Sequence, residues 1–223
     1  MSMNLSTQTL NMLGMGIFET LLMTFVSSFL AYLIGIPLGI CLVVSAKDGI
    51  KPMPLVNIIL GVIINILRSI PFIILLIMVL PLTRVMVGTT LGAKAVIPPL
   101  VIAAAPYIAR MVESSLKEVD AGVIEAAKSM GASNFQIVWK VLLPEATPSL
   151  LLGAAISITT ILGYSAMAGF TGGGGLGTIA INYGYYRYQT DVMLITVAIL
   201  VIIVQIIQET WMHMSRISDK RVR

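Results

Sequence analysis

The sequence predicts an all-α integral membrane protein with five transmembrane helices. Of its 223 residues, 57% are hydrophobic and only 11% are charged, against roughly 25% charged residues in a soluble domain. A soluble fold needs a charged surface, and this composition does not supply one. Apolar runs of about 20 residues, the helix length that crosses a bilayer core of about 30 Å, occur five times along the chain.

The five expected spans follow from the positions of these apolar runs. They cover about residues 20–44, 56–81, 91–110, 149–170 and 191–211. The third is the shortest, because only fifteen residues separate Lys94 from Arg110, about 22 Å of helix. Lys94 must therefore reach toward the interface, or the helix must begin earlier. Three prolines in this run, Pro98, Pro99 and Pro106, predict a distorted helix packed against protein.

The basic residues predict the orientation, because cytoplasmic loops carry an excess of Lys and Arg. Five spans place the two termini on opposite sides, and a basic tail at residues 212–223 places the C-terminus inside. Alternation from there puts ten basic residues inside and three outside. The tail residues are Arg216, Lys220, Arg221 and Arg223, and the outside residues are Arg84, Lys94 and Arg187. The N-terminus is therefore expected outside and the C-terminus in the cytoplasm.

The side chains available for chemistry exclude several classes of function. The net charge of +4 comes from basic residues spread between apolar runs, with no basic stripe for nucleic acid. Cys41 lies in an apolar run, and the lone His213 lies near a helix end beside Trp211. The sequence contains no G-x-x-x-x-G-K-[ST] motif for ATP. We expect no catalytic residues, no metal and no cofactor in this chain.

A glycine-rich run formally matches a nucleotide-binding motif. Gly172, Gly174 and Gly177 fit G-x-G-x-x-G, but that motif requires a preceding strand, and none is expected here. The run favours instead a tight re-entry of the chain or a flexible contact for an external partner.

The one long polar interruption, about residues 113–148, predicts two short helices joined by a turn. The apolar face of the first helix comprises Val119, Val123, Ala126, Ala127 and Met130. Asp120 is placed to cap the start of this helix, and Gly131 is placed to end it.

The second helix of this loop begins with a capping-box pair, Ser133 and Gln136. Its expected apolar stripe, with spacing i, i+3, i+4 and i+7, is Phe135, Val138, Trp139 and Leu142. Pro144 is expected to stop it. An exposed stripe of this kind needs a partner groove or the membrane surface to cover it, and the residues alone leave both open.

This loop resembles the coupling loop of ABC importer permeases, EAA-x3-G-x9-[IV]-x-L-P, which likewise precedes the last two spans. The matching residues are Glu125-Ala126-Ala127, Gly131 and Val141-x-Leu143-Pro144. The resemblance extends over about residues 17–207, through segments 65–72, 109–113, 163–167 and 183–185, and is closest to the methionine-import permeases. It implies a type I ABC importer permease fold. The residues that it implies for docking on a cytoplasmic ATPase are Glu125, Ala126, Ala127, Gly131, Phe135, Val138, Trp139, Leu142, Leu143 and Pro144.

The same resemblance implies ATP-driven amino-acid import across a bacterial cytoplasmic membrane, with methionine as substrate. Its implied partners are a second copy of the chain, two ATPase subunits that bind ATP and Mg, and an external substrate-binding lipoprotein. A polar amino acid such as histidine or glutamine is the alternative substrate. An ion-coupled secondary transporter is the alternative mechanism, but Glu19, Asp191 and Glu209 all lie at span ends, where they form no relay.

Arg68 stands out because it falls mid-span in the second expected helix. Exposure of a charge to lipid there costs at least about 2.5 kcal/mol, so Arg68 should face the bundle or an aqueous path. It would either bind helix carbonyls near Pro71 and lock a bend, which we favour, or present a cation to a substrate carboxylate. Tyr164, Ser165 and Met167 in the fourth span are candidates for the same translocation path, although we favour ordinary helix packing by small neighbours for them.

Overall fold

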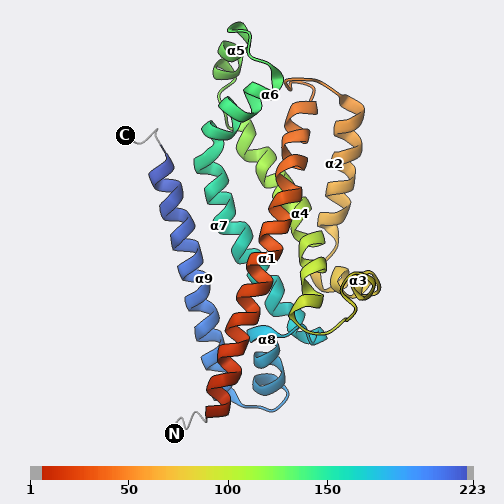
Figure 1. Cartoon of the computed structure of the whole chain (residues 1–223), viewed down its shortest axis with the longest axis vertical. Helices are drawn as coiled ribbons and strands as arrows, with labels where there is room; N and C mark the ends of the chain where they lie inside the picture. Colours follow the sequence, from red (N-terminus) through yellow and green to blue (C-terminus); the bar gives the residue numbers. More distant parts are fainter. Residues whose placement is uncertain (1–6, 220–223) are drawn as a thin grey trace. The chain divides into compact units, whose positions relative to one another are not determined.

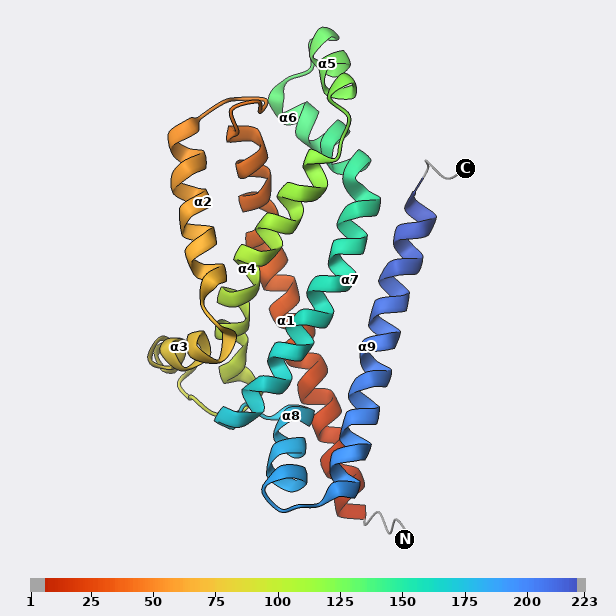
Figure 2. The same cartoon turned by 180° about the vertical axis from the view of Figure 1, so that it is seen from behind.

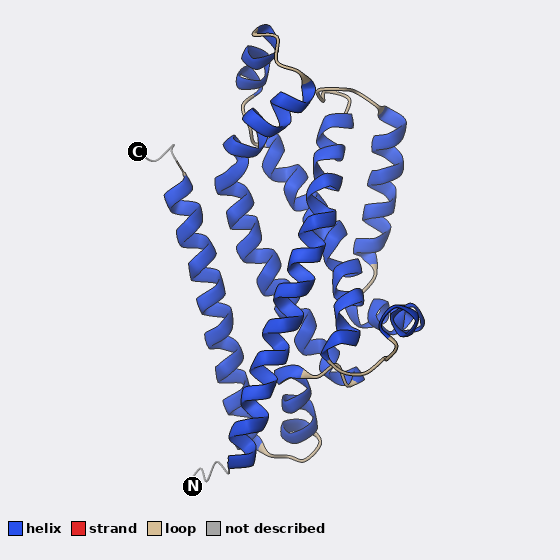
Figure 3. Cartoon of the chain, in the orientation of Figure 1, coloured by secondary structure: helices blue, strands red, loops and turns tan. Residues whose placement is uncertain are grey.

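The computed structural model describes residues 7–219, and this part of the chain contains helices and no β-strand (Figure 3). In chain order the elements are α1 (Thr7–Ser45), α2 (Pro54–Ser69), α3 (Phe72–Val87), α4 (Ala93–Lys117), α5 (Ala121–Ser129), α6 (Asn134–Ile137), η1 (Val138–Leu142), α7 (Leu143–Met167), η2 (Ala168–Thr171), α8 (Gly175–Ile179), η3 (Ala180–Tyr185) and α9 (Thr190–Ser218) (Figure 1). The all-α prediction is confirmed.

Four helical stretches are long and apolar enough to cross a membrane: α1, α4, residues 134–171, and α9. The pair α2 and α3 makes a fifth span when it is counted as one. The expected continuous helix over residues 56–81 is therefore wrong, because it is interrupted at Ile70 and Pro71. Proline donates no backbone N–H and restricts the residue before it. Pro71 has an extended ψ of 136° and caps the start of α3 instead of continuing α2.

Four spans also extend beyond their expected bounds. α1 begins at Thr7, not near residue 20, and α7 begins at Leu143, not near residue 149. The third, expected to be short, is the 25-residue helix α4, which passes Pro98, Pro99 and Pro106 without interruption and continues to Lys117. Just over half of its most apolar stretch is buried (56%), more than in the other three spans, as expected for a helix packed against protein. The last span, α9, continues to Ser218, into the predicted tail. Lys220, Arg221 and Arg223 lie outside the described residues, and the orientation stays a prediction.

The chain divides into two compact units, each made of three separate segments. The first contains residues 7–30, 70–103 and 158–207, and the second contains residues 31–69, 104–157 and 208–219. Each of the four long helices, α1, α4, α7 and α9, contributes one part to each unit.

In the first unit, the N-terminal part of α1 packs against α8. Leu13, Leu176 and Ile179 form a buried cluster that is covered by apolar residues of α9. α8 lies beside this part of α1 in both Figure 1 and Figure 2. Gly16 permits the close approach, because a Cβ there would lie 2.5 Å from the side chain of Ile179.

The glycine-rich run forms a tight turn that leads into α8. Gly172, Gly174 and Gly175 have φ angles of 74°, 79° and 73°, a region that favours glycine. The Gly175 backbone N–H donates to Glu19 Oε2 at 2.6 Å, and the Leu176 N–H donates to Thr20 Oγ1 at 2.9 Å. No strand precedes this run in the described chain, so it lacks the context of a dinucleotide site. The run is an anchored turn, in line with the expected tight re-entry.

In the second unit, α1 and α4 approach closely through glycines. A Cβ on Gly39 would lie 2.6 Å from Val112 Cβ, and one on Gly35 would lie 2.6 Å from Ile108 Cγ2. Small residues spaced four apart commonly allow such helix contacts in membranes. Leu42, Ile64 and Ala109 form the buried cluster that joins α1, α2 and α4 in this unit.

Candidate functional site

The loop between α4 and α7 is built by two helix caps that the sequence predicts. Asp120 Oδ1 accepts a hydrogen bond from the Gly122 N–H at 2.7 Å and starts α5. Gly131, with φ at 79°, ends this helix. Its N–H donates to the Lys128 carbonyl at 2.9 Å, and the Ala132 N–H donates to the Ala127 carbonyl at 3.1 Å. This is the Schellman pattern, so both predicted ends of α5 are confirmed.

The predicted capping box at the next helix is also confirmed. The Ser133 N–H donates to Gln136 Oε1 at 2.8 Å, and the Gln136 N–H donates to Ser133 Oγ at 3.3 Å. α5 and α6 therefore form a hairpin whose turn is fixed by Gly131 and Ser133 (Figure 1).

The expectation that Pro144 stops the second helix is wrong. From Val138 to Leu142 the backbone forms a π-helix, in which the Leu143 N–H bonds to the Val138 carbonyl five residues back. Helix continues through Pro144 to Met167. The wider π turn shifts the hydrogen-bond register, which is how a proline without a donor N–H is accommodated inside a long helix. The loop thus passes directly into the next span, and Pro144 lies in the first turn of α7.

The predicted apolar stripe divides into a buried half and an exposed half. Val138 and Leu142 are buried, with exposed fractions of 8% and 1%, while Phe135 and Trp139 are 70% and 56% exposed. The two exposed rings lie together, with centroids 5.9 Å apart. The expectation that all four residues await a partner is therefore wrong for Val138 and Leu142, which pack within this chain.

The first helix divides in the same way. Val119 and Ala127 are buried within the chain, whereas Ala126, Val123 and Met130 are exposed. We call Val123, Met130, Phe135 and Trp139, the large apolar side chains that the hairpin leaves exposed, the hairpin apolar set. Its presence means that this hairpin still has apolar surface to cover.

The remaining residues of the coupling-loop motif are either exposed or half-buried. Glu125 is exposed, and its carboxylate makes no ion pair with any residue from 7 to 219. Leu143 is half-buried, and Pro144 is exposed. The motif therefore supplies a carboxylate without an ion-pair partner in the described chain, on the same helix, α5, that exposes Val123.

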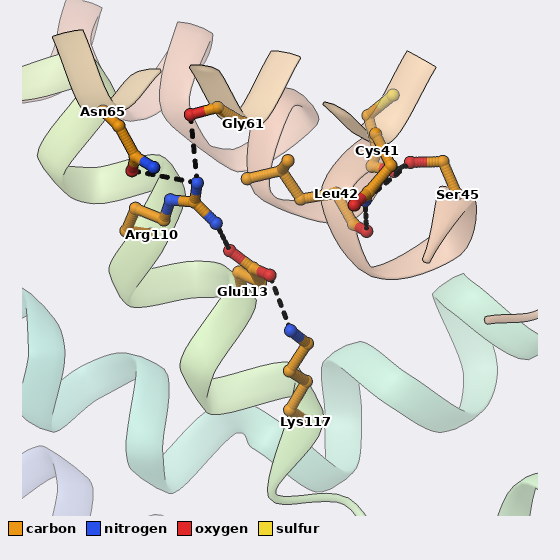
Figure 4. A network of polar contacts seen from close by, with 9 residues as sticks. Cys41, Leu42, Ser45, Gly61, Asn65, Arg110, Glu113 and Lys117 are labelled. Atoms are coloured by element: carbon orange, nitrogen blue, oxygen red, sulfur yellow. Dashed lines mark hydrogen bonds and ion pairs between the residues drawn. The ribbon is translucent and has the colours of Figure 1, made fainter. Parts of the chain in front are cut away.

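A polar network on α4 was not expected from the sequence (Figure 4). Arg110 donates from Nη1 to Glu113 Oε2 at 2.6 Å, and from Nη2 to the Gly61 carbonyl at 3.1 Å and Asn65 Oδ1 at 3.0 Å. Lys117 Nζ donates to Glu113 Oε1 at 2.7 Å. The network joins the C-terminal part of α4 to α2. The i, i+3 and i+7 spacing of its charges was the available signal, but Arg110 was expected at the end of the third span and Lys117 in the loop that follows it.

Arg68 does not lie inside a continuous helix, as was expected from the sequence. It occupies the last turn of α2, one residue before the helix ends at Ser69, and it is exposed. It makes no hydrogen bond or ion pair with the described residues, so the expected bond to carbonyls near Pro71 is absent. The break at Pro71 turns a predicted interior position into a helix end.

The three candidate path residues of α7 point in different directions. The Tyr164 ring stacks on Phe72, with centroids 4.6 Å apart and planes 4° apart. The buried Ser165 hydroxyl donates to the Leu162 carbonyl of its own helix at 2.7 Å. Met167 is 44% exposed. Their role in a translocation path, like that of Arg68, stays a prediction.

Comparison with known proteins places the hairpin and its spans in context. Residues 31–223 match the family described as "Binding-protein-dependent transport system inner membrane component". Over 203 residues, the chain is 45% identical to a protein from Vibrio cholerae described as a probable D-methionine transport system permease protein. This alignment covers 91% of the chain and 90% of that protein.

Solved structures give the same relationship. A chain from inward-facing structures of the MetNI methionine ABC transporter is 47% identical, with a TM-score of 0.95. The match covers 96% of this chain and 100% of that one. A chain of an amino acid ABC transporter crystallised with histidines has a TM-score of 0.78 at 20% identity and covers 97% of this chain and 99% of that one, a likeness of fold alone.

Proposed function

Because the chain belongs to the family of binding-protein-dependent transport system inner membrane components, we propose that it is the membrane subunit of a methionine importer. The chain is a multi-pass protein of the inner membrane, and it is a permease subunit, not an ATPase. The assignment of methionine as the substrate is supported by the 45% identity to a protein described as a probable D-methionine permease, over nine-tenths of both chains. The chain of the amino acid ABC transporter crystallised with histidines has a similar fold, but its 20% identity does not support a shared substrate.

The α5–α6 hairpin is proposed to dock on the ATPase subunit. The hairpin is fixed by caps at both ends of its turn, so it presents a rigid surface. Phe135 and Trp139 are exposed side by side, and buried aromatic anchors commonly dominate the binding energy of interfaces. Glu125 adds a carboxylate without an ion-pair partner in the described chain.

The continuous helix from the hairpin into α7 supports a mechanism of coupling. Because η1 leads into α7 without a loop, movement of the hairpin acts directly on a membrane span. In the proposed cycle, the ATPase subunits bind ATP and Mg and close, the hairpin moves with them, and the spans alternate between inward-open and outward-open states. ATP can drive this change only by binding one state better than the other.

The proposed assembly contains two copies of this chain and two ATPase subunits, as the relationship to MetNI suggests. An external substrate-binding protein completes it, as the family description implies. The N-outside orientation, which places the α5–α6 hairpin in the cytoplasm, is part of the proposal.

The test is transport by the reconstituted assembly. The chain, its ATPase and its binding protein are placed in vesicles, and ATP-dependent uptake of labelled L- and D-methionine is compared with uptake of histidine and glutamine. We expect uptake of methionine and little uptake of the polar amino acids. Robust histidine or glutamine uptake without methionine uptake would reverse the assignment of substrate.

A further inference from the structure

The turn that joins α1 to α2, residues 46–53, is held in a fixed shape by its backbone. The Lys51 N–H donates to the Val44 carbonyl at 3.1 Å, and the Met53 N–H donates to the Ser45 carbonyl at 3.0 Å. These bonds satisfy carbonyls at the end of α1 that have no partner within the helix. The turn therefore presents a preformed surface, which lies at the same end of the second unit as the α5–α6 hairpin (Figure 1).

A cavity of about 400 Å³ lies between this turn and α5. The buried part of its lining is apolar and consists of Leu116, Val119 and Leu142, each at most 7% exposed. Asp48 of the turn and Ala121 of α5 also line the cavity and are exposed, so the cavity opens at the protein surface. Its apolar interior offers water no hydrogen bonds, and an apolar group would fill it better.

The polar groups of the cavity do not favour a charged ligand. The lysines in or beside the lining are balanced by an equal number of carboxylates: Lys47, Lys51, Lys117 and Lys128 against Asp48, Glu113, Glu118 and Asp120. The buried side-chain oxygens that lack a partner in the described chain belong to Ser27, Ser28 and Thr83, none of which lines the cavity. An apolar interior with balanced charges at its mouth is instead typical of a protein–protein contact, which has an apolar centre and a polar rim.

One wall of the cavity belongs to the hairpin that we propose as the docking surface for the ATPase. Ala121, Ile124 and Lys128 of α5 form this wall. Val123 and Glu125, which flank Ile124 in the sequence, are exposed on the same helix. A subunit that covers α5 would therefore also reach the mouth of the cavity, and the α1–α2 turn forms the other wall.

We propose that the ATPase subunit makes a second contact with this chain, in which one of its apolar side chains enters the cavity and the α1–α2 turn becomes part of the docking surface. This inference rests on the proposed docking of the hairpin on the ATPase. It has a consequence for coupling. Because the turn follows the end of α1 and leads into α2, movement of the ATPase would act on these two helices as well as on α7.

Site-specific photocrosslinking tests this contact in the purified complex of the chain with its ATPase. Benzoylphenylalanine is placed, one position at a time, at Asp48 in the cavity lining, at Phe135 on the hairpin and at Val85, an 85%-exposed residue of α3. We expect crosslinks to the ATPase from Asp48 and Phe135 and none from Val85. A crosslink from Phe135 without one from Asp48 overturns this inference and leaves the proposed function standing, whereas the absence of both overturns both. An equal crosslink from Val85 would show unspecific contact and also overturn the inference.

A cavity-filling variant tests whether a side chain of the ATPase enters. Ala121→Leu adds apolar volume at the mouth of the cavity without changing its charge. Burial of one apolar side chain strengthens binding by about tenfold or more, so we expect about tenfold weaker affinity for the ATPase. The matched control is Ala198→Leu, at an exposed alanine of α9 that does not line the cavity, and it should bind like the wild type. Both variants should keep the wild-type unfolding temperature.

A change in the opposite wall separates the cavity from the rest of the hairpin surface. Ile50 of the turn lines the cavity, and Ile50→Ala should also weaken ATPase affinity. If one ATPase side chain contacts both walls, the loss in the Ile50→Ala and Ala121→Leu double variant should be smaller than the product of the two separate losses. Wild-type affinity in either single variant overturns the proposal, and so does a double variant whose losses simply multiply.

Discussion

Replacing Trp139 with Ala separates docking from folding, because the indole is exposed in the single chain. An aromatic side chain buries about 150 to 250 Å² when fully covered, and Trp139 is 56% exposed. Covering the exposed half would remove about 100 Å² from water, worth about 2.5 kcal/mol at 25 cal/mol per Å². We therefore expect Trp139→Ala to weaken ATPase binding by roughly 60-fold, since about 1.4 kcal/mol is a factor of ten.

The assay compares Trp139→Ala with Leu142→Ala, a change one turn further along the same helix. Leu142 is only 1% exposed, so its truncation should destabilise the chain by about 2 to 5 kcal/mol. Each variant is measured for thermal unfolding in detergent and for affinity of the ATPase subunit. Trp139→Ala should keep the wild-type unfolding temperature and lose affinity, and Leu142→Ala should lose stability. Wild-type ATPase affinity in Trp139→Ala would refute the docking role of this surface.

Three further changes test the backbone and the polar network. Gly131→Val should weaken ATPase binding by misdirecting α6, because a β-branched residue at a φ of 79° costs at least about 1 to 2 kcal/mol; a variant that binds like the wild type would contradict this. Arg110→Met should destabilise the chain by about 1.5 to 3 kcal/mol, because the 8%-exposed Glu113 loses one of its two cationic partners and keeps only Lys117. Thermal unfolding of the double variant with Glu113→Gln should show partial recovery, and no recovery would mean that Arg110 acts through packing alone. Gly175→Ala should lower the unfolding temperature, because its Cβ would lie 2.7 Å from Thr20 Oγ1 at a φ of 73°, and an unchanged temperature would show that the turn adapts.

Features that depend on neighbouring residues were predictable from the sequence. Asp120, Gly131 and Ser133 fix the ends of two helices through bonds that reach at most a few residues. The residue types that supply such bonds are few, so their spacing along the chain is enough to predict the hairpin. The apolar runs likewise predicted the spans, because length and composition determine which helices a bilayer accepts.

Features that depend on the hydrogen-bond register of a helix, or on partners far away along the chain, were not predictable from the sequence. Pro144 suggested a helix end, but the π-turn before it changes the hydrogen-bond pattern, and sequence spacing does not reveal such a turn. The same turn contributes to dividing a regular stripe into buried Leu142 and exposed Trp139. The sequence did not predict the Arg110 network, because two of its acceptors, Gly61 and Asn65, are more than 40 residues away on α2.

The anchoring of α8 by α1 has a consequence for synthesis of the chain. Glu19 and Thr20 accept N–H groups from residues that follow them by 156 positions. At about 5 to 20 residues per second, these donors leave the ribosome roughly 10 to 30 s after their acceptors. During that interval the carboxylate of α1 must remain without its native partner in or near the membrane. Final placement of the first span therefore waits for almost the whole chain. We expect nascent chains that stop before Gly175 to be open to membrane proteases at their oldest helix.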